Sequence, residues 1–336
     1  MTTLYRSATA SLHSSARSAV ACAILTVFTG GCGVQGDQGA ATFLVESSWT
    51  PSTPIALAST IAVSASRKDL LKTALAVEAE PATVMAKKGA GFQAVGTGNV
   101  TFRAVDPASQ ALIDTVSYEV AKTETAGLSY GPDRVLDPKN RVAAAFTIVA
   151  GANVDLLPEL ADKQGRQLNH KGIVTLQAEG GASVAAKSAS YTVSAAAAGV
   201  GKVTLAVAGV DGKPAISDVH VVTAVALTDV AAVDLQAMTV LADLSASDQT
   251  KPGVATPPGQ AEPAPADKVV FVVAQAKDAA GQRIYGAVGN WSVTAGTAKL
   301  FFTKPGDVQY LVLKPGEKVT IQVEITGKIA TKAIEG

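Results

Sequence analysis

Hydrophobic and polar residues alternate along most of this chain, in short runs separated by Gly, Pro, Asn and Asp. The clearest run is Val319 to Ile325, where four β-branched apolar residues alternate with Thr320, Gln322 and Glu324. Residues 100–104, 191–193 and 203–207 show the same period. One apolar and one polar face are typical of an antiparallel sheet that covers a core on one side. Many such strands with turn signals between them predict an all-β fold built of sandwiches.

Other segments have less regular patterns. Val142 to Ala150 and Val269 to Ala274 are apolar on both faces, which fits a central strand or a short buried helix. The polar start and spaced apolar residues of Ser66 to Leu75 predict a short capped helix. Residues 229–244 fit both a helical stripe and an alternating strand, and we favour strands joined by an irregular crossing. The five prolines of residues 251–267 predict an exposed loop or linker.

Three segments repeat one layout: a strand, a turn of the Asp-x-x-Gly type, an apolar residue three positions later, and a second strand. The turns begin at Asp106, Asp162 and Asp278. The apolar residues that follow are Leu112, Leu168 and Ile284. The Asp carboxylate accepts hydrogen bonds from nearby backbone amides, and Gly adopts the positive φ that closes the turn. We therefore expect three tight turns, each followed by an apolar residue that returns the chain to a core.

The first copy differs from the others because Ser109 stands in the Gly position. The second strand carries a large residue that we expect to point inward, Tyr118 in the first copy and Trp291 in the third. The second copy has Ile173 to Leu176 at this place. This layout resembles the bacterial immunoglobulin-like domains of cell-surface proteins, and the last two copies match best. The resemblance implies a fold and says little about function, because such sandwiches host many roles.

The expected organisation is a series of segments along the chain. They are a signal peptide at 1–31, a flexible lipidated tether at 32–54, a β-rich domain at 55–139, and tandem immunoglobulin-like β-sandwiches at 140–228 and 229–336. The signal peptide is indicated by Arg6, Arg17 and the apolar run from Ala19 to Phe28, followed by small residues. That run is shorter than the roughly 20 residues that a membrane-spanning helix needs.

The end of this signal resembles that of bacterial lipoproteins, which usually read Leu, Ala or Ser, Gly or Ala, then a modified Cys. Here the motif is Thr29-Gly30-Gly31-Cys32, with Thr29 in the place of Leu. The resemblance implies palmitate-type acylation of Cys32 and attachment to a membrane through the lipid. Gly33 is not the Asp that retains some lipoproteins at the inner membrane, so the outer membrane is favoured. The alternative is a cleaved signal on a secreted or periplasmic protein.

Composition limits the classes of partner. The 305 residues after position 31 exceed the size at which a single core keeps growing, so two or three domains are expected. Two of the 28 Lys and Arg residues and none of the 28 Asp and Glu residues precede position 32, so the remainder has a formal charge of −2. A nucleic-acid partner calls for a basic face, and none is expected here. The chain is 48% hydrophobic but only 5% aromatic, which predicts thin cores of small residues.

We find no arrangement of residues that predicts catalysis, a metal site or a cofactor. His170 and His220 are far apart in sequence, and we expect both at the surface or at strand edges. Residues 210–214 are better explained by an Asp-Gly hairpin turn than by a calcium loop, which needs six or more oxygen ligands. Residues 199–202 lack the remaining residues of a phosphate-binding loop. Trp49 and Tyr310 are expected to pack internally rather than to stack on a ligand.

The sequence therefore predicts a non-enzymatic lipoprotein of the cell envelope that acts as a spacer or interaction module with an unknown envelope or surface partner. Weak contacts between tandem domains would make it an extended stalk. Two alternatives remain open. A surface adhesin or carbohydrate-binding protein would need an exposed aromatic strip or a loop site. An envelope enzyme would need carboxylates that folding brings together in a cleft, with one pKa raised by its neighbour.

Overall fold

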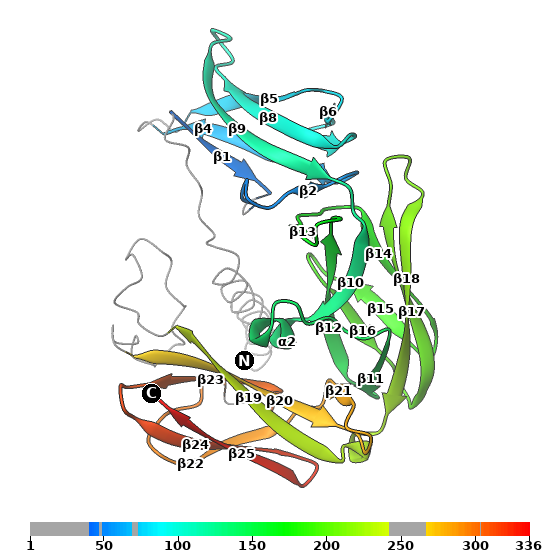
Figure 1. Ribbon diagram of the computed structural model, residues 1–336, viewed down its shortest axis with the longest axis vertical. Helices are drawn as coiled ribbons and strands as arrows, with labels where there is room; N and C mark the ends of the chain where they lie inside the picture. The colour runs from blue at the N-terminus through cyan, green and yellow to red at the C-terminus, as the bar shows by residue number, and fades with distance from the viewer. Residues whose placement is uncertain (1–39, 47–48, 69–72, 242–266, 303) are drawn as a thin grey trace, which may run out of the picture.

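The computed structural model describes residues 40–46, 49–68, 73–241, 267–302 and 304–336. The expected signal peptide, Cys32 and nearly all of the Pro-rich segment at 251–267 lie outside the described residues. The described chain forms three β units in chain order, and the second unit lies between the first and the third (Figure 1). We call the contact between the first and second units the first joint, and that between the second and third units the second joint.

The first unit combines a six-stranded sheet with a small three-stranded one. The large sheet has the order β1 (Ala41–Val45), β4 (Val63–Arg67), β5 (Ala74–Glu80), β8 (Gly98–Val105), β9 (Leu112–Ala121) and β2 (Ile55–Ala56). The small sheet has the order β3 (Thr60–Ile61), β7 (Gly91–Ala94) and β6 (Met85–Lys88). Phe92, Phe102 and Tyr118 pack edge to face in the core, with ring centroids 5.5 and 5.9 Å apart. The Tyr118 hydroxyl donates to the Trp49 carbonyl at 2.9 Å, so both aromatics pack internally as expected.

The second unit is a sandwich of two sheets. One sheet has the order β10 (Thr125–Tyr130), β12 (Asn153–Ala161), β16 (Tyr191–Ser194) and β15 (Ser183–Ala186), with β13 (Gln167–Leu168) beside β12. The other has the order β14 (Val174–Gly180), β17 (Gly199–Ala208), β18 (Pro214–Val225) and β11 (Ala145–Val149). These orders correspond to strands A-B-E-D and C-F-G of an immunoglobulin sandwich, with β11 added parallel to the last strand. The predicted all-β, immunoglobulin-like fold is confirmed.

The third unit repeats this arrangement. Its first sheet contains β19 (Ala232–Leu241), β20 (Lys268–Lys277) and β23 (Val308–Leu313), with β21 (Arg283–Tyr285) at the other end of β20. Its second sheet has the order β22 (Asn290–Ala295), β24 (Lys318–Ile325) and β25 (Lys328–Glu335). A 3₁₀ turn, η1 (Leu227–Asp229), precedes β19. In β24 the predicted apolar face, residues 319, 321, 323 and 325, is buried.

Two predictions about local structure are wrong. Residues 66 and 67 end β4 and residues 74 and 75 begin β5, so no helix spans 66–75; residues 69–72 lie outside the description. The reason is long-range, because Leu75 pairs with Ala65 across the two strands and is buried there. The expected tether at 32–54 contains β1, whose residues Ala41, Phe43 and Val45 are buried with the period of a strand.

The strand pairing also crosses a predicted domain boundary. β10 pairs with β12 along its whole length, from Thr125 opposite Ala161 to Tyr130 opposite Leu156. The predicted boundary at 139/140 divides these paired strands, and the second unit therefore begins near residue 125. Residues 232–241 form one continuous strand, β19, instead of the irregular crossing expected within 229–244.

The segments that are apolar on both faces are strands. β20 is buried on both sides because alternate residues face two different cores. Val270 and Val272 pack inside the third sandwich. Val269, Phe271 and Val273 pack on the opposite face of the sheet, in a cluster that includes Tyr310. β11 accounts in the same way for most of Val142 to Ala150.

The repeated turns form as expected, but one lies elsewhere in the fold. Asp162 and Asp278 each accept two backbone amides, and Gly165 and Gly281 have φ of 76° and 79°. These two turns join β12 to β13 and β20 to β21, and in each case the short second strand pairs antiparallel with the first. The turn at Asp106 joins the long strands β8 and β9 and is one residue longer. Without a glycine at position 109, the positive φ falls on Gln110.

Trp291 is half-buried on β22, where it packs against both clusters of the third unit and donates from its indole nitrogen to the Gly306 carbonyl at 2.9 Å. Trp291→Ala should lower the free energy of unfolding by about 3 kcal/mol, because it removes packed aromatic surface and leaves a cavity. Thermal melting of the full chain measures the change. The control is Val288→Ala at an exposed site nearby, expected within about 0.5 kcal/mol. An unchanged melting curve for Trp291→Ala would show that the ring contributes no packing.

Candidate functional site at the second joint

A short helix, α2 (Gly131–Leu136), lies between the second and third units (Figure 1). It continues directly from β10, and Pro132 in its first turn suits a position where a backbone N–H has no helical partner. The helix contacts β10 and β12 of the second unit and β19 of the third. Because α2 contacts both units, it can determine their relative orientation.

Three consecutive residues of α2 bind in three different places. The Asp133 Oδ1 lies 2.6 Å from Nη1 of Arg283 on β21 in the third unit. The Arg134 Nε lies 2.8 Å from Oε1 of Glu159 on β12 in the second unit. Val135 packs into the cluster formed by Phe271 and its neighbours on β20 and β23. One turn of helix therefore binds the second unit through an ion pair and the third unit through an ion pair and an apolar contact.

The Asp133–Arg283 pair is buried, with the two side chains 9% and 14% exposed. The guanidinium carbon of Arg283 lies 5.5 Å from the ring centroid of Tyr130 and 5.1 Å from that of Tyr285. These two rings pack edge to face at 5.2 Å, and the Tyr130 hydroxyl donates to Asp307. The guanidinium of Arg283 is thus stabilised by the charge of Asp133 and by the two rings, while its Nε and Nη1 are buried without a hydrogen-bond partner among the described residues.

Burial shapes the proton affinity of this group of residues. It raises the pKa of Asp133 from 3.8 to about 6, because the charged form loses water; the charge of Asp307 adds to the rise and that of Arg283 opposes it. Burial and the neighbouring Asp307 raise the pKa of Tyr130 well above its ordinary value. Tyr130 therefore acts here as a hydrogen-bond donor.

The backbone crosses the second joint as a continuous sheet. β21 of the third unit runs parallel to β11, with Thr147 opposite Ile284 and Ile148 opposite Tyr285. β21 also pairs antiparallel with β20, and β11 pairs in parallel with β18. One eight-stranded sheet thus contains strands of both sandwiches. Backbone pairing of this kind restricts rotation of one unit against the other far more than side-chain contact does.

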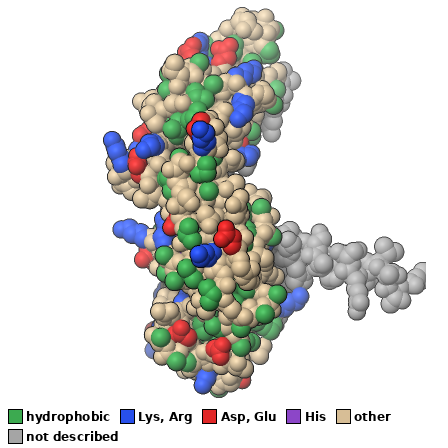
Figure 2. Space-filling model, turned by 90° about the vertical axis from the view of Figure 1, so that its right-hand side faces the viewer, with side chains coloured by type: hydrophobic (Ala, Val, Ile, Leu, Met, Phe, Trp, Pro, Cys, Tyr) green, Lys and Arg blue, Asp and Glu red, His purple; other side chains and the backbone are tan. Residues whose placement is uncertain are grey.

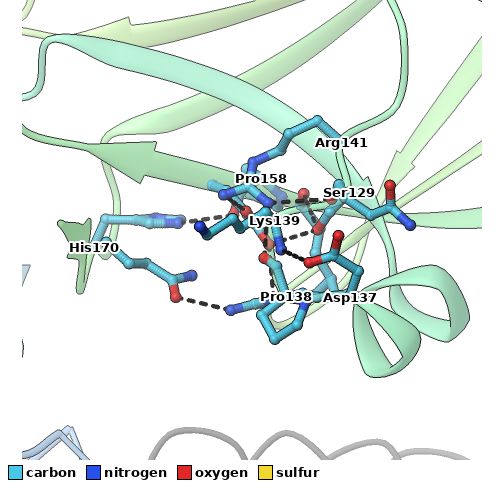
Figure 3. Close-up of polar contacts among 12 residues, drawn as sticks. Ser129, Asp137, Pro138, Lys139, Arg141, Pro158 and His170 are labelled. Carbon is cyan, nitrogen blue, oxygen red and sulfur yellow. Dashed lines mark hydrogen bonds and ion pairs between the residues drawn. The ribbon is translucent and has the colours of Figure 1, made fainter. Parts of the chain in front are cut away.

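A second group of charged and polar side chains contacts Glu159 of β12; Figure 3 shows Ser129, Pro138 and Arg141 among the polar contacts of this region. The side chain of Glu159 is 1% exposed, and its Oε1 accepts from the Ser129 hydroxyl at 2.8 Å as well as from Arg134. Arg141 pairs with Oε2 and donates to the Pro138 and Asn140 carbonyls, both at 3.1 Å. One carboxylate between two guanidinium groups thus holds the chain segment after α2 against β12.

A cavity of about 260 Å³ lies beside this cluster, lined by residues of β10, β12, β18 and the segment after α2. His220 is one of them and is 2% exposed, so its predicted place at the surface is wrong. Its Nδ1 lies 3.1 Å from the Ala143 carbonyl, and its Nε2 lies 3.2 Å from Asp218. His170 is half-buried, with Nε2 3.3 Å from the Pro158 carbonyl. The two histidines occupy separate places and form no common site.

The requirements of the two alternative functions can be compared with this geometry. Among the described residues, Asp133 lies near Asp307 and has a raised pKa, but Arg283 pairs with Asp133, Tyr130 donates to Asp307, and neither acid lines the cavity. Glu159 and Asp218 do both line the cavity, where Glu159 is held by two arginines and Asp218 lies beside His220. In the part of the chain that the structure describes, no aromatic side chain is exposed, so it presents no aromatic strip. The geometry is that of a packed joint.

No three His, Cys, Asp or Glu side chains among the described residues lie close enough to hold a metal ion. No helix in this part of the chain has the length and apolar character to cross a membrane. Figure 2 shows Lys and Arg side chains interspersed with Asp and Glu over one face of the molecule.

Sequence reasoning missed the residues that make this site. Asp133, Glu159 and Arg283 are isolated charges, and nothing in their spacing shows that they would be buried or paired. The one usable signal was the Asp-x-x-Gly turn, which Arg283 follows by two positions. The sequence pattern assigns that turn to the interior of one domain, whereas the structure places the residues that follow it at a joint.

Comparison with known proteins shows only remote similarity. No protein-family model matches the sequence. No curated protein matches it either. Domains 4–9 of the surface layer protein SbsC share 17% identity, with a TM-score of 0.35 over 82% of this chain and 42% of that one. Invasin, described as a bacterial integrin-binding protein, shares 15% identity, with a TM-score of 0.23 over 88% and 59%.

A β-glucuronidase of Parabacteroides merdae shares 10% identity, with a TM-score of 0.23 over 63% of this chain and 24% of that one. The chain spans less than half the length of the surface layer structure. These matches include proteins of different function at low TM-scores, so the functional conclusion rests on the geometry of the chain itself.

Glu159→Gln should lower the free energy of unfolding by about 3–5 kcal/mol, because it leaves buried Arg134 and its neighbour Arg141 without their anion. Urea unfolding followed by tryptophan fluorescence measures the loss. Glu124→Gln is the matched control. It breaks an exposed pair with Lys122 in the segment between β9 and β10 and should cost no more than about 1 kcal/mol. Equal effects of the two variants would contradict the assigned role of Glu159.

Asp133→Asn should remove a pH-dependent component of stability. The pKa of Asp133 is raised from 3.8 to about 6, so the folded chain binds this proton more tightly than the unfolded chain. The resulting stabilisation is fully present below pH 3.8, the ordinary pKa of the carboxyl group, and it is lost as the pH rises through about 6. The two pKa values correspond to about 3 kcal/mol. Urea titrations across this pH range should show the wild type losing stability relative to Asp133→Asn as the pH rises.

His170→Gln provides a comparison of opposite sign. Burial lowers the pKa of His170 from 6.5, so its contribution is lost as the pH falls below that value. The wild type should therefore lose stability relative to His170→Gln on acidification. If Asp133→Asn showed a slope of that same sign, or none, the buried carboxyl assigned to the joint would be ruled out.

Proposed function

We propose that this protein is a spacer of the bacterial cell envelope that carries three β units, the second and third immunoglobulin-like, in fixed relative orientation. The observation that carries the proposal is the parallel pairing of β21 with β11, which joins two sandwiches in one sheet. The expectation of weak contact between tandem domains, and hence of a loosely jointed stalk, does not agree with this pairing. A spacer with stiff joints sets both the distance and the direction at which its far end is presented.

The first joint supports the same proposal. The backbone of Ala56 donates to the Asn169 carbonyl, and Asn169 donates to the Pro54 carbonyl, both at 2.8 Å. A shared apolar cluster covers these bonds, formed by Ala56, Ala58 and Ala121 of the first unit with Leu160, Leu168, Ile173 and Val207 of the second. Water is kept from the backbone bonds, which strengthens them relative to exposed ones.

The attachment is proposed from the signal-like segment that ends at Cys32. Since β1 begins at Ala41 rather than after residue 54, only eight residues separate an acylated Cys32 from the first strand. A fully extended chain of that length spans at most about 30 Å. An anchored protein would therefore hold its first unit close to the bilayer, favoured at the outer membrane, and the later units would provide the reach.

Cys32→Ser should abolish acylation and release the protein from membranes or leave an unprocessed precursor. The reason is that, in the lipoprotein motif which this segment resembles, the lipid is attached to the thiol sulfur of the cysteine. Cell fractionation with labelled palmitate measures both effects. Cys22→Ser, inside the apolar run, is the matched control and should keep label and location. Unlabelled wild-type protein in the soluble fraction would refute the anchor and leave the fixed joints to be judged separately.

A further inference from the structure

The two joints begin with the same local element. The carboxylate of Asp162 accepts the amides of residues 164 and 166, both at 2.9 Å. The carboxylate of Asp278 accepts the amides of residues 280 and 282, at 2.9 and 2.8 Å. Each turn is closed by a glycine with positive φ. These are therefore the same turn, formed once in the second unit and once in the third.

Each turn delivers the next residues to a strand of the preceding unit. After the first turn, Asn169 forms a parallel bridge with Ile55 of β2, and β2 itself lies parallel to β9, the last strand of the first unit. After the second turn, β21 runs parallel to β11, which lies parallel to β18, the last strand of the second unit. The path across each joint is the same.

The apolar residue of each repeat lies inside a joint. Leu168 is 3% exposed and packs with alanines of the first unit. Ile284 is 2% exposed and packs with Val149 of β11 and with Val230. The expectation that these residues return the chain to a core is met, but each core is one that two units share.

Each turn also presents an arginine to an acid of the preceding unit, Arg166 at the first position after its glycine and Arg283 at the second. Arg166 donates to both carboxylate oxygens of Glu119 on β9, at 2.6 and 2.7 Å, and its pairing lowers the pKa of that carboxyl. Arg283 pairs with Asp133 as described above. A bidentate guanidinium–carboxylate contact fixes direction as well as distance. The side chain of the first arginine is 43% exposed, and that of the second is 14% exposed.

We propose that the Asp-x-x-Gly turn, with its arginine and its apolar residue, is a docking element that seats each unit on its predecessor. The surface it fits belongs to an immunoglobulin-like unit whose last strand carries a parallel neighbour, with an acid within reach. This inference deepens the proposed spacer function and rests on it. It names the residues that select which surface a unit docks on.

The copy at Asp106 is an internal comparison. It lies in the hairpin between β8 and β9 and crosses no joint. No arginine follows it within the turn, and its apolar residue, Leu112, is 51% exposed, so the expectation that Leu112 returns the chain to a core is wrong. The arginine and the buried apolar residue therefore accompany docking, whereas the Asp-capped turn alone does not require it.

Native-state hydrogen exchange on the full chain tests the proposal, because it reports rare opening of the joint. The probes are the amides of Ala56 and Asn169, whose hydrogen bonds cross the first joint. Glu119→Gln removes the acid but leaves the turn intact, and it should accelerate both amides about two- to fivefold. Leu168→Ala should accelerate them at least about 30-fold. Glu80→Gln, which breaks the exposed pair with Arg103 within the first unit, is the control and should leave both amides unchanged.

The outcomes separate this proposal from the spacer function. If Glu119→Gln left the two joint amides unchanged, the docking role would be overturned. The docking role would also be overturned if Leu168→Ala accelerated amides throughout the second unit as much as those at the joint. Leu168 would then stabilise the second unit as a whole and not the joint. If the joint amides of the wild type exchanged as fast as unprotected amides, the fixed joint itself would be refuted and the spacer function with it.

Discussion

The parallel pairing of β21 with β11 is the contact on which the rest of this structure depends. It extends one sheet through two sandwiches, and backbone hydrogen bonds of this kind allow only one register and one direction. The buried Asp133–Arg283 pair adds selectivity. A shifted docking would bury one of the two charges without the other, at about 3–5 kcal/mol. Apolar burial on the two sides of the sheet supplies the favourable free energy of docking. The paired charges favour the one arrangement in which neither charge is buried alone.

The short helix α2 connects this joint to the interior of the second unit. Its aspartate faces forward to the third unit, its arginine faces back to Glu159, and its valine packs on β20. A change at any of these three contacts would therefore be transmitted to the other two through six residues of rigid backbone. The same Asp-capped turn operates at both joints, which suggests one repeated solution for stacking units in a fixed direction.

Period-two alternation was sufficient to predict the fold class and individual strands such as β24, because those strands have one face on a core. It was insufficient where partners lie far apart in sequence. Leu75 belongs to a strand because Ala65 pairs with it, and Glu159 is buried because two arginines approach from the segment around α2. The turn at Asp106 follows the same sequence pattern as the other two, with Ser109 in the Gly position, but it lies away from both joints. The strand order decides whether such a turn meets another unit. Residues 269–274 were ambiguous because α2, which covers their second face, starts more than 130 residues earlier.

The central claim is that the three units form one body of fixed orientation. Residual dipolar couplings of backbone amides in the Cys32→Ser chain test it most directly, because each rigid body in solution has one alignment tensor. We predict that one tensor, of one magnitude and direction, fits the couplings from β8 and β9, from β17 and β18, and from β24 and β25 together. Separate tensors of clearly different magnitude for the three pairs would show that the units move independently and would contradict the account.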